Sequence, residues 1–503
     1  MSVAVEPRIT PATIILRPCK RAVKRVPLVF WIALVAALNA ACWSVVSPPF
    51  QVSDEESHVA YVKELADTGR LPSVNAGELS REETLVLAGA RFVRMAGEPG
   101  LSSIATQAEQ HQLERELATA TQLPRDGSEN ASAATAEPPL YYAIEAIPYL
   151  IADNGNLLER LQLMRLVSAL MAGLTALFAF LFVREALPGE SWAWITGGLA
   201  VGLLPLLGEM SGAVNPDSLL YAVSAALFYL LARAFRRGLT RRLAVAIGLV
   251  CAAGLLTKLN FVGLLPGALL GLLLLCWRLA RKSKIEAFGC LVLACVIAAG
   301  PILVSLATGV LAGHDVLNGV SASAGLVAPH GSFLAKLEYV WELYLPRLPG
   351  MANDIPGVFT AIQIWFDGFV GLYGWGDTSF PGWVYDVALL PAGILLCLAV
   401  RGLALRRMVL RGYAAETCVY ALIAAGVIVM VGLSSYGVFP GRDAEYAHVR
   451  YLFPLLAPLG AAFVLATRGA GPRWGRAVGV LIVLLVLAQD IFSQLLVISH
   501  YYG

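Results

Sequence analysis

The first apolar run of the chain is PLVFWIALVAALNAACWSVV, residues 27–46, and the segment SPPFQVSDEESH, residues 47–58, follows it directly. A run of about 20 apolar residues is long enough to cross the apolar core of a bilayer as a helix. Because it is also longer than the apolar region of a secretory signal, we expect an uncleaved anchor. The prolines end this span, and three acids and a histidine then begin a new helix.

The composition of the whole chain agrees with a membrane location. Of its 503 residues, 58% are hydrophobic and only 14% are charged, which is too apolar for a water-compatible surface and excludes a soluble protein. The net charge of +2 gives no support to nucleic-acid binding. The eight cysteines lie in the first 26 residues or in apolar runs, so no disulfide framework is implied. The chain contains no GxxxxGK[ST] segment, which argues against a nucleotide site.

Apolar runs of similar length recur, and we expect about eleven membrane spans. They lie near residues 27–46, 161–183, 192–208, 219–231, 243–257, 261–277, 287–306, 384–400, 418–433, 451–466 and 477–496. Most Lys and Arg residues fall in alternate loops when the N-terminus is placed in the cytoplasm, as the positive-inside rule requires. The apolar stretch Pro138–Ile151 would invert every later loop if it crossed the membrane, so we assign it to the outer interface.

The sequence therefore predicts an all-α polytopic membrane protein with most of its polar residues outside the cell. The expected organisation is a cytoplasmic basic tail (1–26), a first span (27–46), a long extracytoplasmic loop with interfacial helices (47–160), spans 2–7 (161–306), a second, aromatic-rich outer loop (307–383) and spans 8–11 (384–503). The C-terminus is expected outside.

The acids after the first span are the first candidates for chemistry. Ser53 and Glu56 have the spacing of a capping box, and acids in a first helical turn are favoured by the helix dipole. That interpretation does not explain why charges are concentrated at a membrane boundary, where desolvation is costly. Asp54 or Glu55 is a candidate general base, and His58, four residues after Asp54, would lie on the same helix face and orient it or hold phosphate. The motif is only half of a metal site, so we expect no cofactor, a divalent metal being the alternative.

Further polar candidates lie near the outer ends of later spans. Asp217 follows Asn215 and Pro216, which is an ordinary helix start, and it is equally a candidate to face Asp54 across a cavity. Lys258 and Arg450 are isolated from the basic clusters and either extend to the interface or bind phosphate. Arg450 is the stronger phosphate candidate because its guanidinium offers a bidentate fork.

Three more candidates belong to the last two outer segments. Arg442 lies in the same short loop as Arg450 and is an alternative phosphate ligand. Residues 339–385 are rich in aromatics, including Trp375, which form either an interfacial belt or platforms for sugar rings. Asp377 lies among them and is a candidate partner for sugar hydroxyls.

The order of these motifs resembles a known arrangement. It looks like the GT-C superfamily of integral-membrane glycosyltransferases, and within it the bacterial DUF2142 family of membrane proteins is most similar. The resemblance is carried by PPFQVSDEESH (48–58), EPPLYY (137–142), NPDSL (215–219), GLYGWGDTSFPGW (371–383) and HVRYLFPLLAP (448–458).

The resemblance implies roles for individual residues. It implies a catalytic base at Asp54 or Glu55, a cavity-lining acid at Asp217 and a donor phosphate held by Arg450. Two positions depart from the pattern of the family. Glu137 stands where a histidine is expected, which puts a role for this position in doubt. The segment Ala447–Tyr451 keeps the expected Arg-Tyr pair but places His448 and Val449 before it, so His448 and Tyr451 join the candidate substrate-binding residues.

The leading hypothesis is an inverting transfer of a sugar from a polyprenyl-phosphate donor to a cell-envelope glycan or lipid acceptor. The reaction would take place on the extracytoplasmic face of a bacterial plasma membrane, with the prenyl tail in a groove between helices. A transporter or flippase of lipid-linked glycans is the alternative from another class, and a non-catalytic assembly subunit is the third. A transporter is expected to show inverted repeats and broken helices near the midplane, and the sequence shows no such symmetry.

Overall fold

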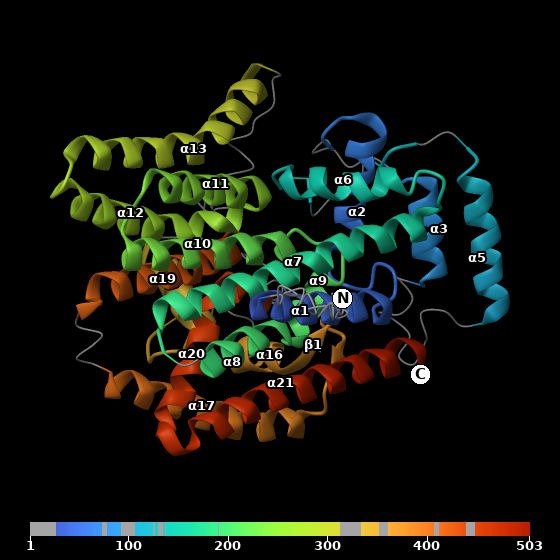
Figure 1. The fold of residues 1–503 in the computed structure, drawn as a ribbon. Coiled ribbons are helices and arrows are strands. Elements are labelled where there is room, and N and C mark those ends of the chain that lie inside the picture. The colour runs from blue at the N-terminus through green and yellow to red at the C-terminus, as the bar shows by residue number, and fades with distance from the viewer. Residues whose placement is uncertain are drawn as a thin grey trace, which may run out of the picture.

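The computed structural model describes residues 27–72, 78–91, 106–123, 126–128, 134–135, 137–189, 191–311, 333–351, 361–406, 412–438 and 448–503. Helices account for nearly all of the regular structure in this part of the chain (Figure 1). They are α1 (Leu28–Val46), α2 (Glu55–Thr68), α3 (Arg81–Gly89), α5 (Gln107–Ala120), α6 (Leu140–Ile151), α7 (Leu157–Ala186), α8 (Ser191–Gly202), α9 (Pro205–Ser211), α10 (Asp217–Arg237), α11 (Arg241–Thr257), η1 (Leu259–Leu264), α12 (Leu265–Ala280), α13 (Lys284–Leu311), α15 (Phe333–Tyr344), η2 (Gln363–Asp367), α16 (Gly368–Gly371), α17 (Gly382–Leu405), α19 (Ala414–Val438), η4 (Val449–Leu455), α20 (Leu456–Gly469) and α21 (Gly471–Tyr502).

Each of the eleven predicted spans coincides with a helix, and the all-α polytopic fold is confirmed. Within the described ranges, nine helices are long and apolar enough to cross a membrane. A tenth span is the pair α8 and α9, which is bent by 54° at the break before Pro205. The predicted span at 243–257 is α11, which has 17 residues and is shorter than these spans. The predicted start at residue 161 is four residues late, because Asn156 caps α7 and starts the helix at Leu157.

The two ends of the helices are segregated as the charge pattern predicts. At one end, Arg237 pairs with Glu185 at 2.6 Å, and Arg236 and Arg468 donate to the carbonyls of residues 186 and 187. These are loops that the sequence places in the cytoplasm. The loops expected outside meet at the other end, where α10 and η4 begin and α11 ends. Since α11 runs between the same two ends as α10, it crosses the bundle despite its length.

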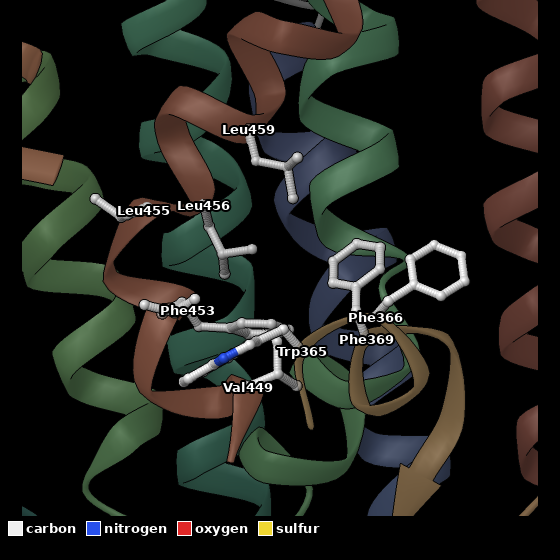
Figure 2. A pocket seen from close by; sticks show the side chains of 9 residues that line it. Trp365, Phe366, Phe369, Val449, Phe453, Leu455, Leu456 and Leu459 are labelled. Atoms are coloured by element: carbon white, nitrogen blue, oxygen red, sulfur yellow. The ribbon is translucent and has the colours of Figure 1, made fainter. Parts of the chain in front are cut away.

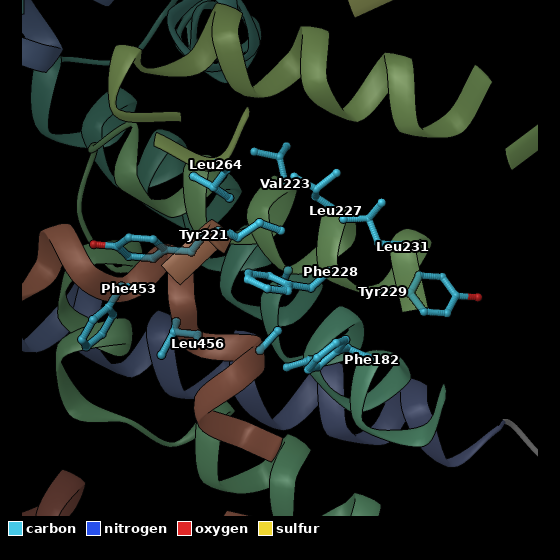
Figure 3. Close-up of a cluster of buried hydrophobic side chains, with 14 of the residues drawn as sticks. Phe182, Tyr221, Val223, Leu227, Phe228, Tyr229, Leu231, Leu264, Phe453 and Leu456 are labelled. Atoms are coloured by element: carbon cyan, nitrogen blue, oxygen red, sulfur yellow. The ribbon is translucent and has the colours of Figure 1, made fainter. Parts of the chain in front are cut away.

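The core of the bundle is built from aromatic and small side chains. Phe182 of α7 packs edge-on against Phe228 of α10 with ring centroids 5.5 Å apart (Figure 3). Both rings also contact Tyr420 of α19, at 5.3 and 5.8 Å between centroids. Elsewhere the helix backbones approach closely at glycines. A Cβ atom on Gly469 of α20 would lie 1.9 Å from the carbonyl oxygen of Leu398 in α17, so this crossing needs a residue without a side chain.

The segment after α1 forms a separate group of helices at one end of α7. Helices α2 and α6 pack together, α3 packs on α5, and both α3 and α6 contact α7 (Figure 1). Helix α6 contains the apolar stretch assigned to the interface, and with 12 residues it is too short to span a bilayer. The buried ring of Tyr61 in α2 stacks on the buried ring of Tyr142 in α6, with 3.6 Å between the ring centroids.

A short hairpin joins this group to the end of α21. Strands β1 (Leu372–Tyr373) and β2 (Thr378–Ser379) are antiparallel, and the turn between them contains Gly374 at φ +64°. A Cβ atom on Gly374 would lie 2.4 Å from the hydroxyl of Tyr501 and 2.7 Å from Asp377 Oδ1. Both the backbone angle and the space therefore require glycine at this position.

An arginine inside the membrane bundle holds the start of the outer segment. Arg165 of α7 is 2% exposed and forms two hydrogen bonds with the Glu55 carboxylate, Nε to Oε1 at 2.7 Å and Nη2 to Oε2 at 2.5 Å. It also donates to the carbonyls of Ser44, Ser47 and Pro48, where α1 ends. This pair fixes the exit of α1 against α7.

We predict that Arg165→Met destabilises the protein by about 3–5 kcal/mol, because it leaves the buried Glu55 carboxylate without a counter-ion. The thermal unfolding of the purified protein in detergent would measure the loss. The double variant Glu55→Gln/Arg165→Met is the control and should recover part of the stability, since it buries no unpaired charge. A single variant as stable as the wild type would contradict a structural role for the pair.

Candidate functional site

Five charged side chains from distant parts of the chain meet where the helix ends converge. They are Asp54 before α2, Glu137 before α6, Asp217 at the start of α10, Lys258 after α11 and Arg450 in η4. We call these five residues, with Tyr451, the ionic cluster. Each acid lies beside a cation at the boundary of an apolar bundle, as expected where an unpaired charge would be costly.

Arg450 is at the centre of the ionic cluster. Its Nη2 forms an ion pair with Asp54 Oδ2 and donates to the Tyr451 hydroxyl at 3.1 Å. Its Nε lies 3.8 Å from Asp217 Oδ2, and neither of these two buried atoms has a hydrogen-bond partner among the described residues. The guanidinium is 7% exposed. One edge of a buried guanidinium and one carboxylate oxygen are thus left without a hydrogen bond, which is unusual for buried polar atoms.

Lys258 supplies the second cation. Its Nζ donates to Asp217 Oδ1 at 2.8 Å and lies 3.9 Å from Glu137 Oε1, with the Tyr451 ring centroid 5.8 Å away. Asp217 is placed by Asn215, whose side-chain oxygen accepts the Asp217 backbone N–H at 3.0 Å. The predicted helix start at Asn215 therefore positions a buried carboxylate. Among the described residues, no group of three or more His, Cys, Asp or Glu side chains has a metal-binding arrangement.

Asp54 has an uncommon backbone conformation. Its φ is +67°, in the left-handed region, and its side chain makes no capping hydrogen bond to α2. Ser53, the residue expected to cap α2, instead donates its hydroxyl to the carbonyl of Gly374. The predicted capping box of Ser53 and Glu56 is therefore wrong, because the hairpin takes the Ser53 side chain. This backbone turn directs Asp54 to Arg450 rather than along its own helix.

Glu55 lies apart from the ionic cluster although it is the next residue. Besides the ion pair with Arg165, it accepts the backbone N–H groups of Phe50 at 2.9 Å and Val214 at 3.0 Å, and it is fully buried. Both of its oxygens are occupied by contacts within the fold. Of the two candidates for a base, Asp54 alone faces the cluster.

Of the two predicted histidines, His58 is buried and His448 is half-buried, and the pKa of each is lowered. His58 lies on α2 and contacts the Tyr142 hydroxyl at 3.0 Å through Nδ1, and burial lowers its pKa to about 3. Burial likewise lowers the pKa of His448 to about 3, with the charge of Arg450 as the next cause. Its Nδ1 accepts the backbone N–H of Arg450 at 3.2 Å. His448 thus positions the Arg450 backbone, and His58 packs between α2 and α6.

The remaining candidates lie elsewhere. Asp377 is in the hairpin turn, where Oδ1 accepts the Trp375 N–H at 3.3 Å and Oδ2 lies 3.4 Å from His500 Nε2. It has no direct contact with the ionic cluster in the described structure. Arg442 lies outside the described residues.

An apolar groove of about 410 Å³ lies beside the ionic cluster, between the η2–α16 segment and the η4–α20 segment (Figure 2). Its lining is entirely hydrophobic and consists of Trp365, Phe366, Phe369, Val449, Leu452, Phe453, Leu455, Leu456 and Leu459. Val449 lines the groove, and the next residue in η4 is Arg450. One turn therefore presents an apolar surface to the groove and a guanidinium to the acids.

Comparison with known proteins identifies the family. A family model described as "Predicted membrane protein (DUF2142)" matches residues 38–459. The chain belongs to the DUF2142 family. This match covers every member of the ionic cluster and confirms a membrane protein with the predicted family resemblance. None of the curated proteins matches the chain.

Among solved structures, this DUF2142 protein is similar to the crystal structure of the Archaeoglobus fulgidus oligosaccharyltransferase in the apo form. The sequence identity is 11% and the TM-score is 0.41, over 95% of this chain and 56% of the archaeal chain. The chain therefore spans little more than half the length of that protein. The likeness is distant.

Three residues near the site were not found from the sequence of this DUF2142 chain. Glu137 was left in doubt because it departs from the family pattern, yet it is a neighbour of Lys258. Arg165 was counted within an apolar span, where an isolated arginine was itself a signal. Glu209 of α9 accepts the Gly374 N–H at 2.8 Å and is 2% exposed, and its signal is an acid within an apolar run.

The acids in and beside the ionic cluster differ in pKa. Burial raises the pKa of Glu137 to about 7, with Lys258 only partly offsetting it. Burial and the adjacent Asp54 likewise raise the pKa of Glu56 to about 7. An acid with a raised pKa favours the protonated form in the folded state. The free energy of unfolding therefore falls as pH rises from about 4.5, the ordinary pKa of the carboxyl, to about 7.

We predict that Glu137→Gln stabilises the protein more at pH 8 than at pH 5. The ionised Glu137 costs at most about 3 kcal/mol at pH 8, because one pKa unit corresponds to about 1.4 kcal/mol, and glutamine removes that cost. Thermal unfolding at the two pH values would measure the difference. Glu116→Gln on the exposed face of α5 is the matched control and should show no such change. An equal effect of Glu137→Gln at both pH values would contradict the raised pKa.

Proposed function

We propose that this chain transfers a sugar from a polyprenyl-phosphate donor to a cell-envelope glycan or lipid acceptor. The observation that carries the proposal is that consecutive residues of η4, Val449 and Arg450, belong to the apolar groove and to the ionic cluster respectively. A donor with an apolar tail and an anionic head needs these two surfaces next to each other. We further propose that the site lies on the extracytoplasmic face of a bacterial plasma membrane, because the basic loops gather at the opposite end of the bundle.

The groove is suited to part of a prenyl chain. Every residue of its lining is hydrophobic, and Trp365 and Phe453 give it flat aromatic walls (Figure 2). Burial of apolar surface contributes about 25 cal/mol per Å², so a long tail gains much of the binding energy there. The head group of a lipid in this groove would lie near η4, where Arg450 is the next residue after Val449.

Arg450 and Lys258 are the phosphate ligands in this proposal. A guanidinium forms two parallel hydrogen bonds with phosphate, and the Nε of Arg450 has no hydrogen-bond partner in the structure. Lys258 lies on the other side of Asp217, at 2.8 Å. The two cations stabilise the charge that develops on the leaving phosphate, which is an electrostatic contribution to catalysis.

Asp54 is the base. Burial alone would raise the pKa of Asp54, but the charge of Arg450 and its hydrogen bond outweigh burial and hold that pKa below its usual value. A phosphate that binds Arg450 competes with this ion pair, which frees the Asp54 carboxylate and raises its pKa. The donor thereby activates the base, and we expect the acceptor to react only after the donor has bound.

The reaction is a single displacement. The acceptor hydroxyl oxygen forms a bond to the anomeric carbon as the bond from that carbon to the phosphate oxygen breaks. The hydroxyl proton passes to Asp54, and polyprenyl phosphate leaves with the bonding electron pair. Attack opposite to the leaving group inverts the anomeric centre. Glu55 has no part in this step, because Arg165 and two backbone amides occupy its oxygens.

A second candidate, transport of lipid-linked glycans, is favoured by one observation. Helices α8 and α9 form a broken span with a 54° bend, a feature common at the substrate sites of transporters. The inverted-repeat symmetry that a transporter is expected to show is not found in the sequence, so the broken span alone favours transport. Glu209, which follows the break, is tied to the Gly374 amide and thus to the hairpin. In the proposed enzyme, the break therefore positions Glu209 to hold the hairpin. A flipping assay separates the two functions.

We predict that Asp54→Asn lowers the transfer rate by about 100-fold to 10,000-fold, the range that a general base contributes. The measurement is transfer of radiolabel from a panel of polyprenyl-phosphate sugars to an envelope extract by the purified protein. Size-exclusion chromatography would establish that the variant is folded, and Glu114→Gln on α5 is the control.

Two outcomes would contradict this assignment. Full transfer by Asp54→Asn would remove the carboxylate from the mechanism. Movement of a fluorescent lipid-linked glycan across proteoliposomes, with no transfer by the wild type, would favour the transporter.

We predict that Leu459→Trp raises the KM for long-chain donors and leaves the KM for short-chain donors nearly unchanged. The added ring fills the far end of the groove from Val449 and Arg450, where only a long tail reaches (Figure 2). The measurement is the transfer rate against donor concentration for two donors with different prenyl lengths. Leu484→Trp on the exposed face of α21 is the control. An equal change in KM for both donors would place the tail elsewhere.

A further inference from the structure

The hairpin turn presents an exposed indole beside the loop that carries Asp54. Trp375 is 45% exposed, and its Nε1 donates to the carbonyl of Phe50 at 3.4 Å. Ser53 donates to the carbonyl of Gly374, the residue before Trp375. The ring is therefore fixed by the same loop that positions Asp54, and its N–H is satisfied within the protein.

Two polar side chains meet beside the turn that carries this indole, one from the turn itself and one from the end of α21. Asp377 Oδ2 and His500 Nε2 are 3.4 Å apart, and the two side chains are each about one-third exposed, at 33% and 34%. His500 is near the end of α21 and packs edge-on against the buried Tyr501, with ring centroids 4.6 Å apart. Asp377 is held through its other oxygen by the Trp375 N–H and the Thr378 hydroxyl.

The turn that joins these groups has little freedom. Gly374 is enclosed by Tyr501 and Asp377, and its N–H donates to the buried carboxylate of Glu209 at 2.8 Å. A residue with a side chain would not fit here, and a shift of the hairpin would break the Glu209 contact. The indole, carboxylate and imidazole are thus placed by fixed backbone and not by a free loop.

We propose that Trp375, Asp377 and His500 form a binding subsite for a saccharide, which is the acceptor of the proposed reaction. The flat apolar face of the indole suits the C–H face of a sugar ring, and the carboxylate and imidazole are partners for its hydroxyls. The Asp377 carboxylate would repel an anionic ligand, so a neutral glycan fits the subsite better than an anion. Its position beside the Asp54 loop brings an acceptor hydroxyl to the base. The role of the saccharide as acceptor rests on the proposed function. The binding of a saccharide at this subsite does not.

The test is glycan binding by the purified protein in detergent, which requires no transfer. Wild-type protein is applied to an array of immobilised neutral oligosaccharides and bacterial surface glycans, and the strongest soluble ligand is titrated calorimetrically. Trp375→Ala should weaken this binding about tenfold or more, and Trp375→Phe, which keeps an aromatic face, by about threefold or less. Asp377→Asn should also weaken it. Trp383→Ala at the exposed start of α17 is the matched control and should bind as the wild type does.

Two results would overturn the subsite. One is the absence of binding to any glycan on the array. The other is unchanged glycan binding by both Trp375→Ala and Asp377→Asn. If Trp375→Ala keeps glycan binding and impairs only insertion into vesicles, Trp375 is an interfacial anchor and not part of a subsite. Asp54→Asn separates this inference from the proposed function, because it should keep glycan binding while transfer is lost. Glycan binding without transfer by the wild type would support the subsite and contradict the enzyme.

Discussion

The structure depends on how a buried guanidinium is neutralised at the edge of an apolar bundle. Arg450 lies between Asp54 and Asp217, and Lys258 lies between Asp217 and Glu137. Charges at this depth are tolerated only in such an alternation. The segments that bring these residues together are the left-handed turn at Asp54, the Asn215 turn before α10 and the 3-10 helix η4. Each is a departure from regular helix, and each places one charge.

The cluster also separates the two kinds of surface that a lipid-linked substrate requires. On one face of η4 lies a groove lined only by hydrophobic side chains. Beyond Asp54 lies the hairpin, whose turn carries Trp375 and Asp377 and contacts the end of α21. Lipid and hydroxylated ligand would thus approach the cluster from different directions. In the proposed reaction, the bond from sugar to phosphate breaks and the bond from sugar to acceptor forms at the charges between these two surfaces.

The sequence was sufficient to predict the helices and the acids and bases at their ends. Apolar run length and the alternation of basic loops depend on local composition, and the predicted spans coincide with α1, α10 and the η4–α20 segment. They also placed Asp54, Asp217 and Arg450 at the same boundary. The sequence could not assign partners, because Arg450 and Asp54 are separated by 396 positions and their contact depends on packing of the whole bundle. For the same reason the sequence could not decide which of Asp54 and Glu55 faces the cluster. The backbone turn at Asp54 directs that side chain to Arg450, and Arg165 holds the side chain of Glu55.

Helix α11 has a consequence for the surrounding lipid. Its 17 residues rise about 26 Å, less than the roughly 30 Å of a typical hydrocarbon layer. Lys258 follows directly at its end. A span shorter than the hydrocarbon layer is accommodated by local thinning of the bilayer or by residues at its ends that reach the interface. A dimple in the outer leaflet would shorten the path of a phosphate from the bilayer surface to Arg450. The distance of the site from the bilayer surface then depends on the thickness of the host membrane, even when the protein itself does not change.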